Sequence, residues 1–257
     1  MKNQKDSIKT EKFKIQDNEY RFPYHYIPYF DSDFNGNRLR ILENGFEYLC
    51  YINHVSLLIH EMNAGSKILE VGCGDGKIIN HLQNKNIVGV DLSEKAINFA
   101  KAFNPEINFI YGDASEILDT FPIIIAIEVL EHIPDEIIPQ FWETLYNKCE
   151  LNGNIIISVP SVNKRMIKKH FRHYDQKRLN EELAMAGLNN KLEIINVEYI
   201  YKETKLIKLW KRFTSNKYWV FEIHYIRKKI WKYIWNHLRI AESDTGYHLI
   251  AVLKKIR

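Results

Sequence analysis

The stretch that decides the fold runs from Ile68 to Gly76 and reads ILEVGCGDG. Its first half is an apolar run typical of a buried strand, and its second half is a glycine-rich turn that opens a helix. Glycine suits this turn because the backbone needs unusual dihedral angles and a ligand must approach it closely. The spacing is G-x-G-x-G, and Lys77 stands where a dinucleotide-binding turn has a third glycine or alanine, which disfavours NAD. The turn also lacks the lysine context of a nucleotide triphosphatase.

Strand and helix patterns alternate on both sides of this turn. A helical pattern precedes it, from Leu39 to Met62, and further helices run up to Leu82 or begin at Ser93, Asp135 and Asp175. The expected strands lie at 67–71, 86–91, 107–113, 123–128, 154–160, 192–200 and 247–253. This order predicts an α/β fold with a Rossmann-like, doubly wound sheet.

Length and composition indicate one globular domain with appendages. The chain has 257 residues and a formal net charge of +4. Its three cysteines, Cys50, Cys73 and Cys149, are odd in number and never form a C-x-x-C pair, which argues against a disulfide framework or a zinc cage. The N-terminal residues lack the apolar core of a signal peptide, and no window reaches the roughly 18 uninterrupted apolar residues of a membrane span. We therefore expect a cytoplasmic protein.

The N-terminal part differs from the rest of the chain. Within residues 1–38, we expect residues 1–20 to form a mobile tail and the remainder an aromatic arm, and we expect residues 39–257 to form the domain. Prolines and a glycine exclude a regular helix in the arm, which reads RFPYHYIPYFDSDFNGNR. The arm could act as a lid, and Tyr24, His25 and Tyr26 are its candidate substrate contacts.

A basic and aromatic helical insertion is expected at about 201–246, before the last strand. From Tyr201 to Ile240 the chain carries eleven Lys and Arg residues against Glu203 and Glu222. Apolar residues recur there at helical spacing with lysines between them. Three interpretations stay open: packing against the domain itself, a lid that admits an anionic substrate, and a patch for a membrane surface or RNA.

Two aspartates follow expected strands and suit a nucleoside. Asp91, in GVDLS, can accept both hydroxyls of a ribose, although it could equally cap the next helix. Asp113, in GDA, could receive an adenine amino group. Both stand where parallel strands end, which is the edge at which open α/β sheets bind ligands.

The ordered segments EVGCGDG, GVDLS, GDA and EVLEH resemble the class I S-adenosylmethionine-dependent methyltransferases over about residues 40–190. The resemblance implies a seven-stranded sheet whose last strand is antiparallel. It also implies S-adenosylmethionine as cofactor, held by Glu70, Gly72, Cys73, Gly74 and Gly76 around the methionine part, Asp91 and Leu92 at the ribose, Asp113 and Ala114 at the adenine, and Glu128 nearby.

The segment from Glu128 to His132 reads EVLEH and follows the fourth expected strand. On a helical turn, Glu128, Glu131 and His132 would share one face and could bind Mg²⁺, Mn²⁺ or Fe²⁺. Similar segments occur in ubiquinone-pathway O-methyltransferases and small-RNA 3′-end methyltransferases. We choose His173 over His170 as a fourth ligand, because the segment around Arg172 and His173 resembles one that borders the active site in such enzymes. The alternative is that His173 orients a loop and His132 only lines the cleft.

These features predict an S-adenosylmethionine-dependent O-methyltransferase in which His132 or His173 takes the acceptor's proton or a divalent metal activates the acceptor. The expected acceptor is a small anionic molecule, phosphorylated or glycan-linked, as in surface-polysaccharide biosynthesis, with Arg172 as a further substrate contact. Two alternatives remain: RNA 2′-O-methylation, for which no recognisable RNA-binding module is present, and a non-catalytic protein that binds the cofactor. Peripheral membrane contact is compatible with the basic insertion.

Overall fold

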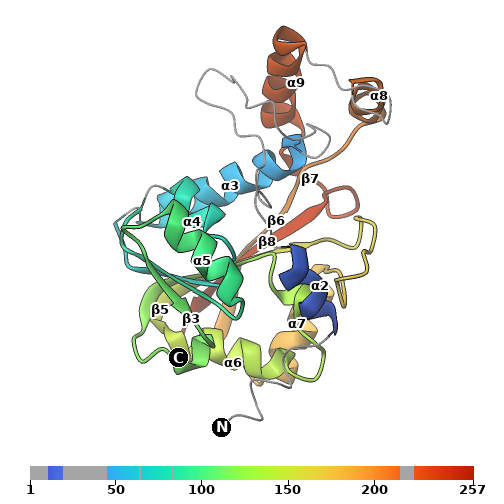
Figure 1. Cartoon of the computed structure of the whole chain (residues 1–257). Coiled ribbons are helices and arrows are strands. Elements are labelled where there is room, and N and C mark those ends of the chain that lie inside the picture. The colour runs from blue at the N-terminus through green and yellow to red at the C-terminus, as the bar shows by residue number, and fades with distance from the viewer. Residues whose placement is uncertain (1–10, 20–44, 64, 83, 215–222) are drawn as a thin grey trace.

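The computed structural model describes residues 11–19, 45–63, 65–82, 84–214 and 223–257. Its centre is an eight-stranded sheet with the order β3-β2-β1-β4-β5-β8-β6-β7. Helices surround this sheet (Figure 1). The strands are β1 (Ile68–Val71), β2 (Ile87–Asp91), β3 (Asn108–Tyr111), β4 (Phe121–Ile127), β5 (Cys149–Pro160), β6 (Leu192–Ile200), β7 (Ile240–Ala241) and β8 (His248–Lys255).

The strand directions confirm the predicted doubly wound sheet. Strands β1 to β5 pair in parallel, whereas β8 runs antiparallel between β5 and β6. The reversed last strand was therefore predicted correctly. The two-residue strand β7 is an addition to the predicted seven, and it pairs with the outer side of β6.

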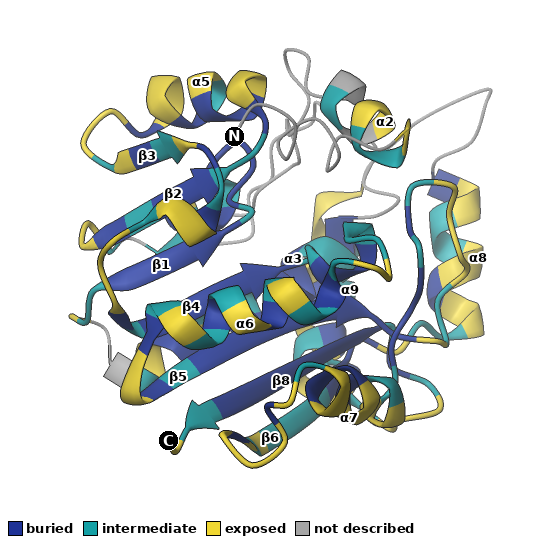
Figure 2. Ribbon diagram, turned by 90° about the horizontal axis from the view of Figure 1, so that it is seen from below, coloured by how far each residue is buried: buried dark blue, intermediate teal, exposed yellow. Residues whose placement is uncertain are grey.

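Helices cover both faces of the sheet, as the continuous apolar runs of the central strands require. The helices are α2 (Glu11–Glu19), α3 (Gly45–Asn63), α4 (Lys77–Leu82), α5 (Glu94–Phe103), α6 (Ile138–Lys148), α7 (Gln176–Met185), α8 (Lys205–Thr214) and α9 (His224–His237), with short 3₁₀ turns η1 (Ala114–Glu116) and η2 (Leu130–His132). One core joins α3, α4, α5 and α9 to one face of the sheet, and a second joins α6 and α7 to the other. The central strands are consequently buried on both sides (Figure 2).

Local sequence signals explain where several helices begin. Ser93 caps α5 by accepting a hydrogen bond from the amide of Ala96, and Asp175 caps α7 by accepting one from the amide of Arg178 at 2.7 Å. The expected helix from Leu39 is present as α3 from Gly45, and its first expected residues lie outside the described part of the chain. All three cysteines are free and buried.

The N-terminal region departs from expectation. The mobile tail predicted up to residue 20 is wrong for Glu11–Glu19, which form α2. This helix has no apolar periodicity that would reveal it, and its tertiary contacts hold it: Lys12 donates to the carbonyl of His170 at 2.6 Å, and Asp17 accepts from the hydroxyl of Ser93. The aromatic arm, with Tyr24, His25 and Tyr26, lies outside the described residues.

The insertion before β8 consists of α8 and α9, which project beyond the sheet (Figure 1). Helix α9 packs against α3, where the rings of Phe46 and Trp231 stack with centroids 6.4 Å apart. Among the described helices, none is long and apolar enough to cross a membrane.

Candidate active site

The glycine turn after β1 has the backbone that its sequence predicts. Gly72, Gly74 and Gly76 all have positive φ, at 74°, 53° and 76°. The amide of Gly72 donates to the carbonyl of Val90 at 2.8 Å, which fastens the turn to β2. A Cβ atom at Gly72 would come within 2.6 Å of a methyl group of Val129, so only glycine fits between this turn and the EVLEH segment.

Asp91, at the end of β2, joins the glycine turn to the start of α5. One carboxylate oxygen accepts from the amide of Gly74 at 2.8 Å and the other from the amide of Ser93 at 2.8 Å. Burial raises the pKa of Asp91 to about 6, although both amides oppose the shift. Each carboxylate oxygen can accept a second hydrogen bond, which leaves Asp91 able to bind the two hydroxyls of a ribose.

Glu70 supplies an unsatisfied acid next to this turn. Its side chain is 2% exposed, and its Oε2 atom is buried without a hydrogen-bond partner among the described residues. Burial, followed by the charges of Asp91 and Asp75, raises its pKa well above the ordinary value. An orphaned acceptor among three acids suits a cationic ligand, and S-adenosylmethionine carries both an ammonium and a sulfonium group. Cys73 is buried within the same turn.

A pocket of about 470 Å³ opens beside the end of β2, and α2 forms one of its walls. Phe13, Lys14 and Asp17 of α2 face Leu92 to Lys95 and the ring of Tyr111 across it. Asp113 follows Tyr111 and caps η1 by accepting from the amide of Ser115 at 2.8 Å, and Ala114 is buried beside it. The residues predicted to hold ribose and adenine thus lie at one edge of the sheet.

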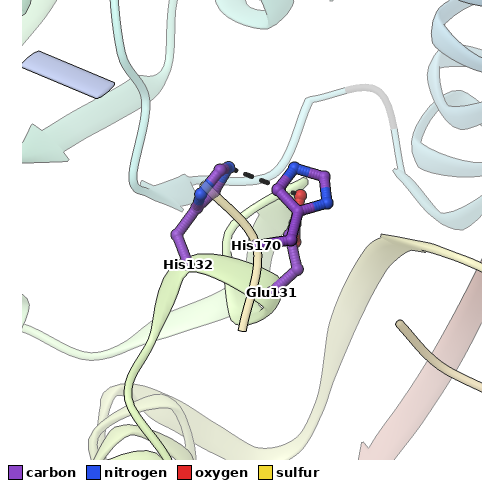
Figure 3. A group of neighbouring side chains, drawn as sticks. All are labelled: Glu131, His132 and His170. Atoms are coloured by element: carbon purple, nitrogen blue, oxygen red, sulfur yellow. Dashed lines mark ion pairs between the residues drawn. The ribbon is translucent and has the colours of Figure 1, made fainter. Parts of the chain in front are cut away.

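The EVLEH segment forms the second half of the site. After β4 ends, η2 places Glu131 and His132 side by side, and the loop before α7 brings His170 against them (Figure 3). Atoms of Glu131, His132 and His170 that could bind a metal all lie within 4.8 Å of one another. The amide of Phe171 donates to the carbonyl of Glu131 at 2.7 Å, which ties the two segments together.

Backbone carbonyls fix the proton positions of the three histidines. The carbonyl of Lys169 faces Nδ1 of His132 at 3.2 Å, and that of Lys164 faces Nδ1 of His173 at 3.0 Å, so both Nδ1 atoms must carry the proton. Nε2 of His173 then accepts from Nδ1 of His170, 2.9 Å away. Nε2 of His170 is therefore left unprotonated, which is the form that binds a metal or accepts a proton, and Nε2 of His132 lies 3.6 Å from Oε1 of Glu131.

The electrostatics separate the roles of these side chains. Burial, with His132 and His173 as neighbours, lowers the pKa of His170 to about 3, so His170 is neutral and a weak base at neutral pH. Burial, reinforced by the charge of Glu128, raises the pKa of Glu131 well above the ordinary value. The side chain of His132 is 22% exposed and is the one group of the three with access to an acceptor.

Glu128 does not join this group. Its backbone has a positive φ of 56°, and its Oε1 accepts from the hydroxyl of Ser158 at 2.8 Å and from Nδ1 of His248 at 3.1 Å. The predicted set of metal ligands, Glu128, Glu131, His132 and His173, therefore differs from the group that the structure forms. The structure brings Glu131 and His132 together with His170 and places His173 behind His170.

Arg172 lies on the protein side of the loop rather than in an open cleft. Its side chain is 8% exposed, its guanidinium pairs with Asp135 at 2.8 Å, and Nη1 donates to the carbonyl of Leu130 at 2.9 Å. These contacts hold η2 against the loop that carries His170. The geometry therefore favours a positioning role for Arg172 over the predicted substrate contact.

Comparisons with known proteins settle the family. Residues 41–220 match the methyltransferase domain family. The chain belongs to the class I S-adenosylmethionine-dependent methyltransferases. A methyltransferase from Archaeoglobus fulgidus shares the fold of this chain, with a TM-score of 0.57 and 15% sequence identity. The match covers 85% of this chain and all of the Archaeoglobus chain. Magnesium protoporphyrin IX methyltransferase from Synechocystis, with bound S-adenosylmethionine, has a TM-score of 0.57 at 15% identity over 96% and 98% of the two chains.

Curated relatives of this methyltransferase carry names of two activities. A mitochondrial ubiquinone biosynthesis O-methyltransferase from Schizosaccharomyces pombe is 30% identical over 49% of this chain and 48% of its own length. A carboxy-S-adenosyl-L-methionine synthase from Campylobacter concisus is 27% identical over 65% of this chain and 78% of its own length. The methyltransferase thus spans about half, or less, of the ubiquinone O-methyltransferases it matches.

Sequence reasoning missed two parts of this methyltransferase site. Helix α2 has no signal in the pattern, and the buried partners of Glu128, namely Ser158 and His248, are 30 and 120 residues away along the chain. The sequence favours His173 over His170 as a metal ligand, whereas the structure groups His170 with Glu131 and His132. The three-residue spacing of the two histidines could not show which of them faces Glu131.

Proposed function

We propose that the chain transfers a methyl group from S-adenosylmethionine to a hydroxyl oxygen of a small-molecule acceptor. The observation that carries the proposal is the position of the Glu131, His132 and His170 group next to the glycine turn, with Val129 in contact distance of Gly72. A methyl donor held by the turn would lie beside the imidazole of His132. The names of the ubiquinone O-methyltransferase relatives support oxygen as the acceptor atom.

Within this proposal, the predicted cofactor residues keep their roles. Glu70 accepts from the ammonium group of the methionine part, and the turn from Gly72 through Cys73 and Gly74 to Gly76 lies against that part. Asp91 with Leu92 binds the ribose, and Asp113 with Ala114 faces the adenine. Helix α2 covers the pocket on this side and excludes water from it.

Methyl transfer is an in-line displacement in which the acceptor oxygen bonds to carbon while the bond from carbon to sulfur breaks. The protein must align the two partners and remove the hydroxyl proton. His132 is the best-placed base, because its side chain is 22% exposed whereas Glu131 and His170 are buried. His173 is a positioning residue, because Lys164 and His170 occupy both of its ring nitrogens.

A divalent metal fits the same group. Two imidazole nitrogens and one carboxylate form a set that Mn²⁺, Fe²⁺ or Mg²⁺ accepts, and Glu131 has a buried Oε2 with no hydrogen-bond partner among the described residues. His173 would support His170 through its second nitrogen, as hydrogen-bonded partners do for metal-binding histidines. When bound, the metal would lower the pKa of the acceptor hydroxyl.

The names of the relatives bear on which class of acceptor is methylated. None of the relatives described above supports a surface-polysaccharide acceptor, and the O-methyltransferases among them are named for ubiquinone biosynthesis. RNA 2′-O-methylation remains the second candidate, because the basic insertion carries exposed lysines on α8 and α9. A non-catalytic role would not explain why Glu131, His132 and His170 gather at this edge of the sheet.

The test of this function is transfer of labelled methyl groups to three acceptor pools: polyprenyl phenols, soluble phosphorylated or glycosylated metabolites, and total RNA. We expect label in a small-molecule pool, with turnover lost in His132→Ala and cofactor affinity retained. Label in RNA would transfer the assignment to the second candidate. Unchanged turnover of His132→Ala would refute the proposed base.

A calorimetric titration tests the metal separately. Mn²⁺ is added to metal-stripped protein saturated with S-adenosylhomocysteine, using wild type, His132→Ala, His170→Ala and His173→Ala. We expect stoichiometric binding in wild type and loss of binding in His132→Ala and His170→Ala. If His173 supports His170, His173→Ala should bind Mn²⁺ about 10- to 100-fold more weakly. His60→Ala, at an exposed end of α3, is the matched control. Absence of binding in wild type leaves His132 as a base without metal.

A further inference from the structure

Helix α8 sorts its side chains onto three faces. Ile207 and Thr214 are buried against the protein. A second face is apolar and exposed: Leu206, Leu209 and Phe213 are 79%, 64% and 56% exposed. The third face carries the exposed cations Lys205, Lys208 and Arg212. At 100° per residue, the exposed apolar stripe lies between the buried face and the basic face.

This arrangement differs from that of a helix packed on its own domain. In such a helix the apolar stripe faces the core and polar residues face water. Here Ile207 already fills the core-facing position, and the leucines at 206 and 209 form a second stripe in solvent. Large apolar side chains grouped in solvent mark an interaction surface.

Two contacts attach this surface to the rest of the protein. Lys211 pairs with Glu203 at 2.6 Å at the base of α8, and Ile207 belongs to the same core as α3 and α9. The helix projects beyond the sheet together with α9, so its outer side can meet a large partner (Figure 1). Exposed Lys228, Lys229 and Lys232 of α9 keep this end of the molecule basic.

We propose that α8 docks the protein on the surface of an anionic lipid bilayer. The apolar stripe, represented by Leu206 and Leu209, inserts into the boundary between headgroups and acyl chains, and Lys205 and Lys208 contact the lipid phosphates. Interfacial helices combine these two features, because apolar burial and attraction to anionic lipid add to each other.

The stripe favours lipid over the other occupants. RNA would use the lysines, but it would leave the leucines of a regular helix in water. A second copy of the chain could cover the leucines, but it would bring two basic faces together, which costs free energy. The surface of an anionic bilayer satisfies both the apolar and the basic face.

Vesicle flotation tests the proposal with full-length protein. The vesicles are phosphatidylcholine with about 30% phosphatidylglycerol, compared with pure phosphatidylcholine. Wild type should float with the anionic vesicles. Leu206→Ser with Leu209→Ser should weaken binding about 100-fold, taking roughly tenfold per leucine. Lys205→Gln with Lys208→Gln should weaken it about tenfold and reduce its salt dependence. Leu118→Ser, at a side chain 98% exposed, is the matched control and should bind like wild type.

Binding of S-adenosylhomocysteine by each variant shows that it is folded and does not depend on methyl transfer. Failure of wild type to float would overturn the proposal, as would equal flotation of the two-leucine variant. A gel shift of RNA that the lysine variant loses and the leucine variant keeps, without flotation, would assign the surface to RNA. A dimer in wild type that the leucine variant loses would assign it to self-association.

Discussion

A buried chain of charges lies behind the EVLEH segment. Nε2 of His248 lies 3.0 Å from Glu47, and its Nδ1 lies 3.1 Å from Glu128. Burial alone would raise the pKa of both glutamates, yet His248 and Lys164 lower each to about 2. Burial would lower the pKa of His248, but Glu128 and Glu47 raise it. The buried charges are therefore stable only together.

This network predicts how stability depends on pH. The glutamate pKa values are lowered in the folded state, so their contribution is present above about 4.5 and is lost as pH falls from about 4.5 towards 2. The raised pKa of His248 acts oppositely, with a contribution that is complete below about 6.5 and is lost as pH rises through the folded value. Urea unfolding between pH 3 and 8 should show both limbs.

The variant His248→Gln should lower the free energy of unfolding by about 3–5 kcal/mol at pH 7, because it leaves buried carboxylates with fewer partners. The difference from wild type should shrink at pH 3, where those carboxylates are protonated in the variant. His60→Gln serves as an exposed control. A constant difference across pH would contradict the charge network.

Gly72 and Gly187 form a matched pair for testing the cofactor turn. Both have positive φ, at 74° and 65°, but a Cβ atom would meet Val129 at 2.6 Å at Gly72 and nothing within 4 Å at Gly187. Gly187→Ala should cost about 1 kcal/mol of stability through backbone strain alone. Gly72→Ala should also reduce affinity for S-adenosylhomocysteine by at least about tenfold, measured by calorimetry. Equal affinities of the two variants would remove Gly72 from the cofactor site.

At the scale of elements, α2 forms a wall of the pocket beside the end of β2, and the sequence pattern did not predict this helix. Its Lys12 reaches the carbonyl of His170, and its Asp17 reaches Ser93, so the helix connects the cofactor end of the site to the histidine group. Removing residues 1–19 should weaken binding of S-adenosylhomocysteine about tenfold, since a wall of the pocket is lost. A second variant that lacks only residues 1–10 keeps α2 and serves as the control. Similar affinities of the two truncated proteins would show that α2 does not cover the cofactor.

The strands and the glycine turn could be predicted because their signals are local. Runs such as IIIAI in β4 are buried on both faces, and the turn declares itself by three glycines. Helix α2 and the two-residue strand β7 depend on tertiary contacts and leave no such pattern. The choice between His170 and His173 depended on which ring turns towards Glu131, and spacing along the chain does not encode that.

At the scale of the whole molecule, β8 carries His248 into the interior of the sheet. It lies between β5 and β6, and six consecutive residues from His248 to Leu253 are buried. The C-terminal strand therefore completes both the core and the charge network of Glu128. The doubly wound order was predictable from alternation, whereas this link between the chain's end and the active site was not.

The same architecture predicts a gradient of amide hydrogen exchange. Amides of β4, β5 and β8 should exchange slowest, because these strands are central and buried, and those of α2 and α8 should exchange fastest among the described helices. Saturation with S-adenosylhomocysteine should slow exchange at the glycine turn, at Asp91 to Ser93 and in α2, but leave α8 unchanged. Protection of α8 by the cofactor would couple the lipid-facing helix to the active site. Protection of the glycine turn without α2 would show that the N-terminal helix is not part of the cofactor site.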